Sequence, residues 1–304
     1  MKVLVLGIGS MGLNHVKTLA QLKREGLVTE IYAVDIDKQR LNLAKNQGAD
    51  LVFTNVNEAL QYKPELGIIA VPTNQHYETA KSLINHMDLL VEKPIAEKLS
   101  EALDLYRKAR ELGRKIFVGH IERFNPAYNA LINEINNEEP TYVESIRIGL
   151  LKGDPSKYGN VLLDLGIHDI DLVLNIINED EVRIMGKILR GDPIRTAWVM
   201  LEIGNIPYIL HTSWDYETRV RRLTILMKDR YYDTDLLNKF LYRNGTKHII
   251  EGEDQLRREL IHVINALRGV ERPIIDIADG IRALAVINAI LTDQQIINLN
   301  EVLK

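Results

Sequence analysis

Two groups of residues in this sequence could carry out acid–base chemistry on an alcohol. In Glu92-Lys93-Pro94, a lysine follows an apolar run and precedes a proline that restricts the local backbone. Asp164 and His168 are four residues apart and would share one face of an α-helix. An imidazole accepts a proton near neutral pH, and a lysine or carboxylate can polarise or orient the hydroxyl. Lys93, Asp164 and His168 are therefore candidate catalytic residues. The alternatives are a solvated surface lysine at Lys93 and an ordinary helix-surface pair at Asp164 and His168.

A glycine-rich turn near the start of the chain predicts a dinucleotide site. Gly7-Ile8-Gly9-Ser10-Met11-Gly12 follows an apolar strand pattern and opens an amphipathic helix, so it is more than a tight turn. Glycine permits the close approach of the backbone to a pyrophosphate, whose charge the helix N-terminus attracts. The predicted cofactor contacts here are Gly7, Gly9, Ser10, Met11 and Gly12.

Asp35 ends the second expected strand, about twenty residues beyond the glycine turn, where an acidic side chain accepts hydrogen bonds from ribose hydroxyls. Its charge would repel a 2′-phosphate and so favours NAD over NADP. Lys38 and Arg40 nearby leave NADP use open, and Asp37 could share or replace the role of Asp35. The alternative for either aspartate is a solvated loop charge. Ile36 is also expected to contact the cofactor.

The run Val71–His76 follows the fourth expected strand and so lies at the carboxyl edge of the sheet, where open α/β folds bind ligands. We expect Glu92 and Lys93 to line the cofactor site from the same edge. His76 could instead be a helix cap or a packing residue. The predicted contacts from the run are Pro72, Thr73, Asn74 and His76.

Short apolar runs alternate with amphipathic stretches over residues 1–121, which predicts βαβ units in a doubly wound parallel sheet, an α/β Rossmann domain. Residues 122–304 differ, with a helix over 127–135, a helix over 164–177 and two terminal helices. Closely connected strands predict a large, mainly antiparallel sheet in an α+β domain. The segment 230–252 could form strands, a flap or an oligomer contact. The strands expected in this half are Tyr142–Leu151, Glu181–Leu189, Thr196–Ile203, Pro207–Tyr216 and Arg219–Met227.

Composition limits the class of protein. A chain of 304 residues, of which 46% are hydrophobic, is long enough for two domains. The net charge of -4 offers no basic excess for nucleic acid, and the lack of cysteine excludes disulfides and a cysteine nucleophile. The chain enters its first strand directly, and no window reaches the ~20 apolar residues of a membrane helix. We expect a cytoplasmic protein without membrane or nucleic-acid partners.

One group of residues superficially resembles a cluster of metal ligands: Asp164, His168, Asp169 and Asp171. Successive helical positions diverge by about 100°, so Asp169 would face away from Asp164 and His168. Hydride transfer to NAD needs no metal. We expect none, and no serine, histidine and aspartate stand out as a hydrolytic triad.

With these residues in view, the chain resembles the glucose–fructose oxidoreductase, inositol dehydrogenase and MocA (Gfo/Idh/MocA) family over essentially its whole length. The resemblance implies NAD-dependent oxidation of a hydroxyl, Lys93, Asp164 and His168 as the catalytic set, and often a cis peptide before Pro94. The motifs that carry it are Gly7–Gly12, Val71–His76, Glu92–Pro94 and Asp164–Asp171.

Gly119–Pro126 resembles a narrower branch, the UDP-N-acetylhexosamine 3-dehydrogenases. That resemblance implies Arg123 and Asn125 as substrate contacts, and we expect Tyr158 and Asn160 among them as well. Many family members have an arginine just after the third glycine, whereas this chain has Leu13-Asn14. The sequence therefore departs from the family pattern near the nicotinamide half of the cofactor.

These observations predict a dehydrogenase that oxidises a secondary hydroxyl of a sugar, foremost the 3-hydroxyl of a nucleotide sugar such as UDP-N-acetylglucosamine. One alternative is an inositol or free-sugar dehydrogenase. Another is an NAD-dependent glycosidase that oxidises its substrate transiently, and a third is a non-catalytic dinucleotide sensor. An uncovered apolar sheet face in the second half predicts a homodimer or homotetramer.

Overall fold

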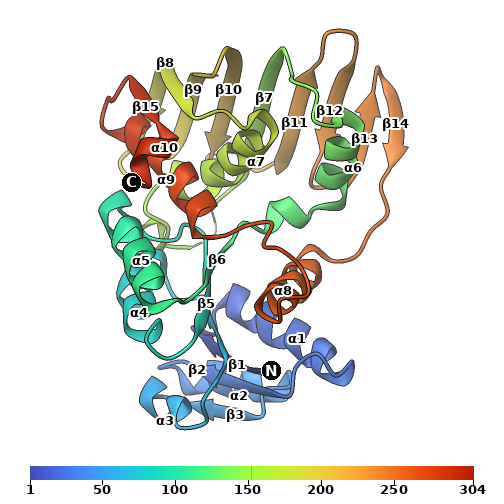
Figure 1. The fold of residues 1–304 in the computed structure, drawn as a ribbon. Coiled ribbons are helices and arrows are strands. Elements are labelled where there is room, and N and C mark those ends of the chain that lie inside the picture. The colour runs from blue at the N-terminus through green and yellow to red at the C-terminus, as the bar shows by residue number, and fades with distance from the viewer. Residues whose placement is uncertain (152) are drawn as a thin grey trace. The chain divides into compact units, whose positions relative to one another are not determined.

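The computed structural model describes residues 1–151 and 153–304, which form two units (Figure 1). The first unit comprises residues 1–119 and 256–278, and the second comprises residues 120–255 and 279–304. The sequence prediction placed the boundary after residue 121 and both terminal helices in the second domain. In the structure the first unit ends two residues earlier, at residue 119, and also includes residues 256–278.

The first unit contains a six-stranded parallel sheet in the order β3-β2-β1-β4-β5-β6. Successive strands are added outward from β1 to β3 on one side and outward from β4 to β6 on the other. This strand order is that of doubly wound dinucleotide-binding folds and confirms the predicted sheet. The strands are β1 (Lys2–Leu6), β2 (Glu30–Val34), β3 (Leu51–Phe53), β4 (Leu66–Ile69), β5 (Asp88–Glu92) and β6 (Ile116–Gly119). The helices are α1 (Ser10–Arg24), α2 (Lys38–Asn46), α3 (Val56–Leu60), α4 (His76–Leu83) and α5 (Leu99–Leu112).

Helix α8 (Gln255–Leu267) joins this unit through its apolar face, one ion pair and a hydrogen bond. Leu260 and Ile264 are fully buried. Arg257 forms a bidentate pair with Glu25, at 3.0 and 2.9 Å, and Arg268 donates to the carbonyl of Leu27 at 2.7 Å. The partners of α8 are therefore far away in the sequence, at the end of α1.

The second unit contains a nine-stranded sheet in the order β14-β13-β12-β11-β7-β10-β9-β8-β15. β7 and β10 pair in parallel and the other neighbours pair antiparallel, which confirms the mainly antiparallel prediction. The segment 230–252, left open by the sequence, supplies three strands. The strands are β7 (Tyr142–Ile148), β8 (Glu181–Arg190), β9 (Thr196–Ile203), β10 (Ile206–Ser213), β11 (Val220–Leu226), β12 (Tyr231–Asp235), β13 (Phe240–Arg243), β14 (Thr246–Ile249) and β15 (Ile296–Asn298).

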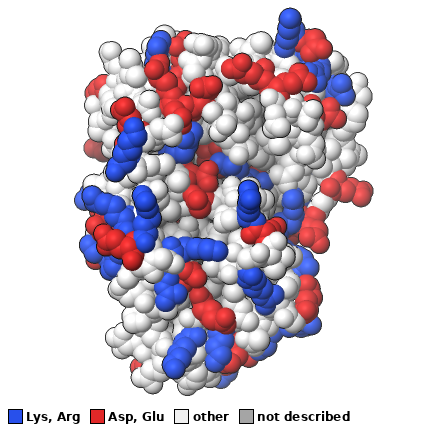
Figure 2. Space-filling model, in the orientation of Figure 1, with Lys and Arg blue, Asp and Glu red and all other residues white. Residues whose placement is uncertain are grey.

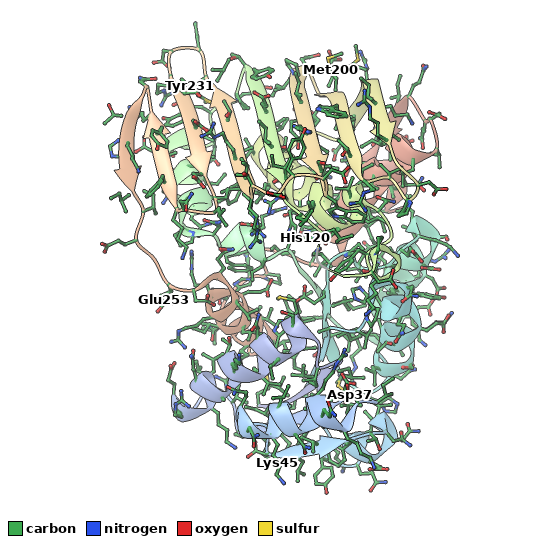
Figure 3. The ribbon with its side chains drawn as sticks, turned by 180° about the vertical axis from the view of Figure 1, so that it is seen from behind. Asp37, Lys45, His120, Met200, Tyr231 and Glu253 are labelled. Atoms are coloured by element: carbon green, nitrogen blue, oxygen red, sulfur yellow. The ribbon has the colours of Figure 1, made fainter. Side chains whose placement is uncertain are left out.

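Helices α6 and α7 lie over one face of this sheet (Figure 1). Strand β9 shows the resulting alternation, because Val199 and Leu201 are buried while Met200 is 46% exposed. Figure 3 shows the opposite face, on which Met200 and Tyr231 lie. The helices are α6 (Pro126–Ile135), α7 (Ile167–Ile177), α9 (Ile277–Leu291) and α10 (Leu299–Val302).

The helix expected over residues 164–177 begins differently from the prediction. A π-helical turn, Leu162–Gly166, leads into α7. The side-chain oxygen of Asn160 starts this turn by accepting hydrogen bonds from Leu162 and Leu163, at 3.0 and 3.1 Å. A π turn bonds residue i to residue i+5, so the α-helical spacing assumed for Asp164 does not hold across it.

Acidic and basic side chains are interspersed on the face drawn in Figure 2. Such mixing of signs is the ordinary pattern of a globular protein surface. Across residues 1–151 and 153–304, none of the helices has both the length and the apolar character that spanning a membrane requires.

Candidate active site

Each of the three glycines in the first turn has a different structural role. Gly7 has a φ of +83°, and a Cβ there would lie 2.6 Å from the carbonyl oxygen of Ala70. A Cβ on Gly12 would lie 1.8 Å from the carbonyl oxygen of Gly7. A Cβ on Gly9 would meet no described atom within 4 Å, which leaves that side of the turn accessible to a ligand. The turn therefore fits a pyrophosphate held at the N-terminus of α1, next to Ser10 and Met11.

Asp35 directly follows β2 and is hydrogen-bonded to the backbone of the glycine turn. Its carboxylate accepts a hydrogen bond from the backbone of Ile8 at 2.6 Å and another from the backbone of Asp37 at 2.8 Å. Arg40 lies 3.8 Å from the same carboxylate and its side chain is half exposed. A carboxylate has about four acceptor positions, so Asp35 can still accept bonds from ribose hydroxyls.

Of the two residues after Asp35, Asp37 has a structural role and Ile36 is exposed to solvent. Asp37 caps α2 by accepting a hydrogen bond from the backbone of Gln39 at 2.8 Å. Ile36 is 92% exposed, the most exposed of the large apolar side chains described. An isolated apolar side chain beside a dinucleotide site is suited to packing against the cofactor.

His76 occupies a structural position within the predicted cofactor loop. It is 2% exposed, with Nδ1 at 2.7 Å from the carbonyl oxygen of Pro94 and Nε2 at 3.0 Å from that of Val71. Burial lowers the pKa of His76, against the effect of these two hydrogen bonds. His76 thus behaves as the packing residue that the sequence allowed, while Pro72, Thr73 and Asn74 form the loop before it.

Glu92 and Lys93 follow one another at the end of β5. Glu92 accepts a hydrogen bond from Nε2 of His15 at 2.7 Å. Burial opposes ionisation of Glu92, but the hydrogen bond from His15 and the positive charges around it hold its pKa below the usual value. A Cβ on Gly119 would lie 2.9 Å from the carboxylate of Glu92, so glycine is needed beside it. Lys93 is partly exposed and precedes a cis peptide, as the family resemblance implied.

Asp164 and His168 lie on the accessible side of their segment in the second unit. Between Val161 and Ile170, only Asp164, Leu165 and His168 are partly exposed, and the other residues are buried. The carboxylate of Asp164 accepts a hydrogen bond from the indole of Trp214 at 3.0 Å. π turns are frequent at functional sites, and this one presents Asp164 on the same accessible side as His168.

The acidic residues beside His168, Asp169 and Asp171, are buried partners of arginines. Arg147 of β7 donates from Nε and Nη2 to one carboxylate oxygen of Asp169, at 2.9 and 2.8 Å. Arg123 binds Asp171 through Nε and Nη2, at 2.7 and 2.8 Å. These ion pairs link the buried side of α7, the helix that carries His168, to β7 and to the segment that contains Arg123.

Two of the expected substrate contacts, Arg123 and Asn125, are bonded to other protein groups. Arg123 is 6% exposed, and besides Asp171 its guanidinium contacts Asn175 and, at 3.4 Å, Asp279. Asn125 is fully buried, where its amide donates to Glu122 and to the carbonyl of Leu236, both at 2.9 Å, and its oxygen caps α6. Both side chains are directed at protein groups, because the loop that carries them is folded inward.

The other two expected substrate contacts lie before the π turn. Tyr158 is partly exposed, and its ring centroid lies 6.5 Å from that of Trp214, edge to face. The oxygen of Asn160 is used to start the π turn. Tyr158 therefore remains a candidate for contact with a ligand.

The sequence reasoning did not select His15, Trp214 or Arg147. Arg147 gave no distinct signal, since β7 also contains Glu144 and Ser145, and nothing indicated which face of β7 was buried. His15 follows the glycine turn closely, and no local pattern related it to Glu92. Trp214 follows β10, and its bond to Asp164 depends on the folded sheet.

Comparison with known proteins relates this chain to oxidoreductases. A family model described as an oxidoreductase family with an NAD-binding Rossmann fold matches residues 1–120. The UDP-N-acetylglucosamine 3-dehydrogenase of Acidithiobacillus ferrooxidans is 28% identical over 96% of this chain and 95% of its own length. Its crystal structure superposes with a TM-score of 0.82 at 25% identity, covering 94% of this chain and 95% of that one.

A second relative shares less of the chain. The inositol 2-dehydrogenase of Pseudarthrobacter chlorophenolicus is 27% identical over 64% of this chain and 60% of its own length. An oxidoreductase from Agrobacterium radiobacter, solved with NAD⁺, L-tartaric acid and magnesium, has the same fold, with a TM-score of 0.85 at 16% identity over 99% of both chains. The glycine turn and the Glu92-Lys93-Pro94 turn therefore lie in a segment, residues 1–120, that matches an oxidoreductase family with an NAD-binding Rossmann fold, and nearly the whole chain is similar to a UDP-N-acetylglucosamine 3-dehydrogenase.

Proposed function

We propose that the protein oxidises a secondary hydroxyl of a nucleotide sugar, with the 3-hydroxyl of UDP-N-acetylglucosamine as the first candidate. NAD, when bound, supplies the acceptor for the hydride that leaves the substrate carbon. His168 takes the hydroxyl proton as the carbon–oxygen double bond forms, and Lys93 polarises the hydroxyl oxygen. Asp164, oriented by Trp214, holds the hydroxyl or the imidazole. The products are a ketone, NADH and a proton.

The observation that carries the substrate proposal is the extent of the similarity. The match to the UDP-N-acetylglucosamine 3-dehydrogenase covers 96% of this chain, whereas the inositol 2-dehydrogenase match covers 64%. Substrate selection in two-domain dehydrogenases depends on the part outside the dinucleotide fold. The more extensive match therefore favours a nucleotide sugar over a polyol.

A screen of purified protein tests this proposal. Mass spectrometry first identifies any bound dinucleotide, and absorbance at 340 nm then follows NADH formation with UDP-sugars, free sugars and inositols. We expect NADH with UDP-N-acetylglucosamine and a 3-keto product that hydroxylamine traps. Turnover of inositol alone would contradict the nucleotide-sugar assignment.

The same screen separates the alternatives of other classes. An NAD-dependent glycosidase would release a free sugar without net NADH. A dinucleotide sensor would bind NAD and turn over none of the compounds. The partial exposure of Lys93, Asp164 and His168 supports catalysis, because a sensor has no need of three accessible titratable groups.

For the cofactor we propose a preference for NAD over NADP. Asp35 accepts two backbone hydrogen bonds and keeps a negative charge where a 2′-phosphate would lie. Arg40 is the competing influence, since its half-exposed guanidinium could bind that phosphate. The ratio of kcat/KM values for the two cofactors decides between them.

We also propose that a second copy of this chain covers the outer face of the nine-stranded sheet. Met200, Ile188 and Met185, on β9 and β8, are 46%, 55% and 55% exposed. Further along the same sheet, the ion pair of Arg222 on β11 and Asp233 on β12 offers self-complementary charges to a symmetric partner. Light scattering should give a dimer or tetramer. A Met200→Glu substitution should produce monomers, and a monomeric wild type would contradict this interface.

A further inference from the structure

Lys93 stands between two neighbours that are each held by a buried histidine. Nε2 of His15 donates to the carboxylate of Glu92 at 2.7 Å, and Nδ1 of His76 lies 2.7 Å from the carbonyl oxygen of Pro94. His15 and His76 are 0% and 2% exposed. The residues on both sides of Lys93 are thus fixed by contacts that the lysine itself does not make.

The two histidines come from the two segments expected to contact the cofactor. His15 belongs to α1, which the glycine turn opens, and His76 is the first residue of α4, directly after the 3₁₀ turn Thr73–Gln75. Each contact therefore links the Lys93 turn to one side of the dinucleotide site. A change at either contact would move the lysine relative to that site.

His76 faces two acceptors, which restricts what it can do. Its Nδ1 and Nε2 meet the carbonyl oxygens of Pro94 and Val71, at 2.7 and 3.0 Å. A neutral imidazole carries one N–H, so it satisfies one carbonyl at a time, whereas an imidazolium satisfies both. Glu92 and Lys93 are the nearby charges, the first favouring the imidazolium and the second opposing it.

Stability alone does not account for these groups. Burying an ionisable pair costs desolvation energy, and well-packed apolar residues in its place are often neutral or stabilising. His15 and Glu92 are nevertheless buried together, and a Cβ on Gly119 would lie 2.9 Å from the carboxylate of Glu92. The arrangement is explained by placement of the turn that they hold.

We propose that His15 and His76 are positioning residues for Lys93, acting through Glu92 and through the carbonyl of Pro94. This inference rests on the catalytic role proposed for Lys93. A misplacement of about 1 Å can cost roughly 100-fold in rate, so loss of either contact should lower kcat strongly.

Asparagine and glutamine substitutions can separate placement from general stability. The amide nitrogen of asparagine lies near the position of histidine Nδ1, and that of glutamine lies near Nε2. His76→Asn should therefore keep the bond to Pro94, and His76→Gln should lose it. The pattern should reverse at His15, where His15→Gln keeps the bond to Glu92 and His15→Asn loses it.

The expected result is a crossed pattern in kcat. His76→Gln and His15→Asn should lose about 10- to 100-fold in kcat with KM close to wild type, while His76→Asn and His15→Gln retain most activity. His86→Ala, at an exposed histidine in the same unit, is the control and should match wild type. Equal effects of asparagine and glutamine at both positions would overturn the proposal.

A measurement without turnover separates this inference from the proposed function. The chain has no cysteine, so Lys93→Cys introduces a single thiol. Its alkylation by iodoacetamide should be faster when His76→Gln is added and unchanged when His76→Asn is added. Equal rates in both would overturn the inference even if Lys93→Ala abolishes turnover. A fully active Lys93→Ala would instead refute the catalytic role proposed for Lys93. The alkylation rates would still show whether His76 determines the position of residue 93.

Discussion

Arg123 and Asp171 form a bidentate, buried ion pair in the second unit, with Nε–Oδ2 and Nη2–Oδ1 distances of 2.7 and 2.8 Å. Their side chains are 4% and 2% exposed. Arg123 is thus committed to the helix that carries His168, although its sequence context resembled a substrate contact. The pair links the 3₁₀ turn Ile121–Phe124 to α7.

Arg123→Ala should destabilise the protein without weakening substrate binding. Removing one partner of a buried ion pair leaves the other charge uncompensated and costs about 3–5 kcal/mol. Urea unfolding should show this loss, while KM for a nucleotide sugar stays near wild type. Arg183→Ala removes an exposed ion pair with Glu181 and should cost less than about 1 kcal/mol. A large rise in KM at unchanged stability would restore Arg123 as a substrate contact.

His168→Ala and Lys93→Ala should each lower kcat while leaving folding and NAD binding nearly intact. Loss of a positioned acid–base group costs about 10²–10⁴-fold in rate. The two losses should be non-additive in the double variant if both groups act in one proton path. Single-turnover formation of NADH with a confirmed substrate is the measurement. Near-wild-type hydride transfer in both variants would remove them from the mechanism.

Asp35→Ala should weaken NAD binding and narrow the difference from NADP. The substitution removes an acceptor for ribose hydroxyls and the charge that opposes a 2′-phosphate. It also removes the bond to the backbone of Ile8, so Asp35→Asn, which keeps an acceptor oxygen there, is the matched variant. Titration with each dinucleotide, followed by fluorescence, gives the affinities. A wild type that binds NADP more tightly than NAD would show that the assignment is incorrect.

Glu259 should make stability depend on pH. Its side chain lies in α8, is 1% exposed, and neither carboxylate oxygen has a hydrogen-bond partner among the described residues. Burial, with the charge of Glu92, raises the pKa of Glu259 well above its usual value. The folded state therefore holds the proton more tightly than the unfolded state. Its contribution to stability is complete below the unfolded pKa of about 4.3 and is lost as pH rises towards the folded pKa.

Glu259→Gln removes this titration. At pH 8 the variant should be more stable than the wild type. The difference should shrink as pH falls from the folded pKa towards 4, by about 1.4 kcal/mol per pH unit within that interval. Urea unfolding between pH 4 and 8 measures it, and Glu111→Gln, at an exposed position of α5, should show no such trend. A difference independent of pH would mean that Glu259 is ionised in the folded protein.

Local patterns in the sequence were sufficient for the parallel sheet and for the glycine turn. Gly7 and Gly12 are required by a turn within six residues and Gly9 leaves one side of it open to a ligand, so their spacing carries the information. The parallel strands are apolar runs separated by amphipathic helices, and right-handed βαβ units leave few other arrangements. The accessible placement of Asp164 and His168 was also anticipated, although through a π turn instead of an α-helical one.

The partners of buried polar groups were decided only by the tertiary structure. Arg123 and Asn125 were expected to contact substrate because Gly119–Pro126 resembles a narrower branch of the family. Their acceptors, Asp171 and the Leu236 carbonyl, are far away in the sequence, so no local pattern indicated them. Likewise, the pattern of α8 showed an apolar face but not which unit would bury it. Residue types determine what a side chain can bond to, whereas long-range packing determines which of those bonds form.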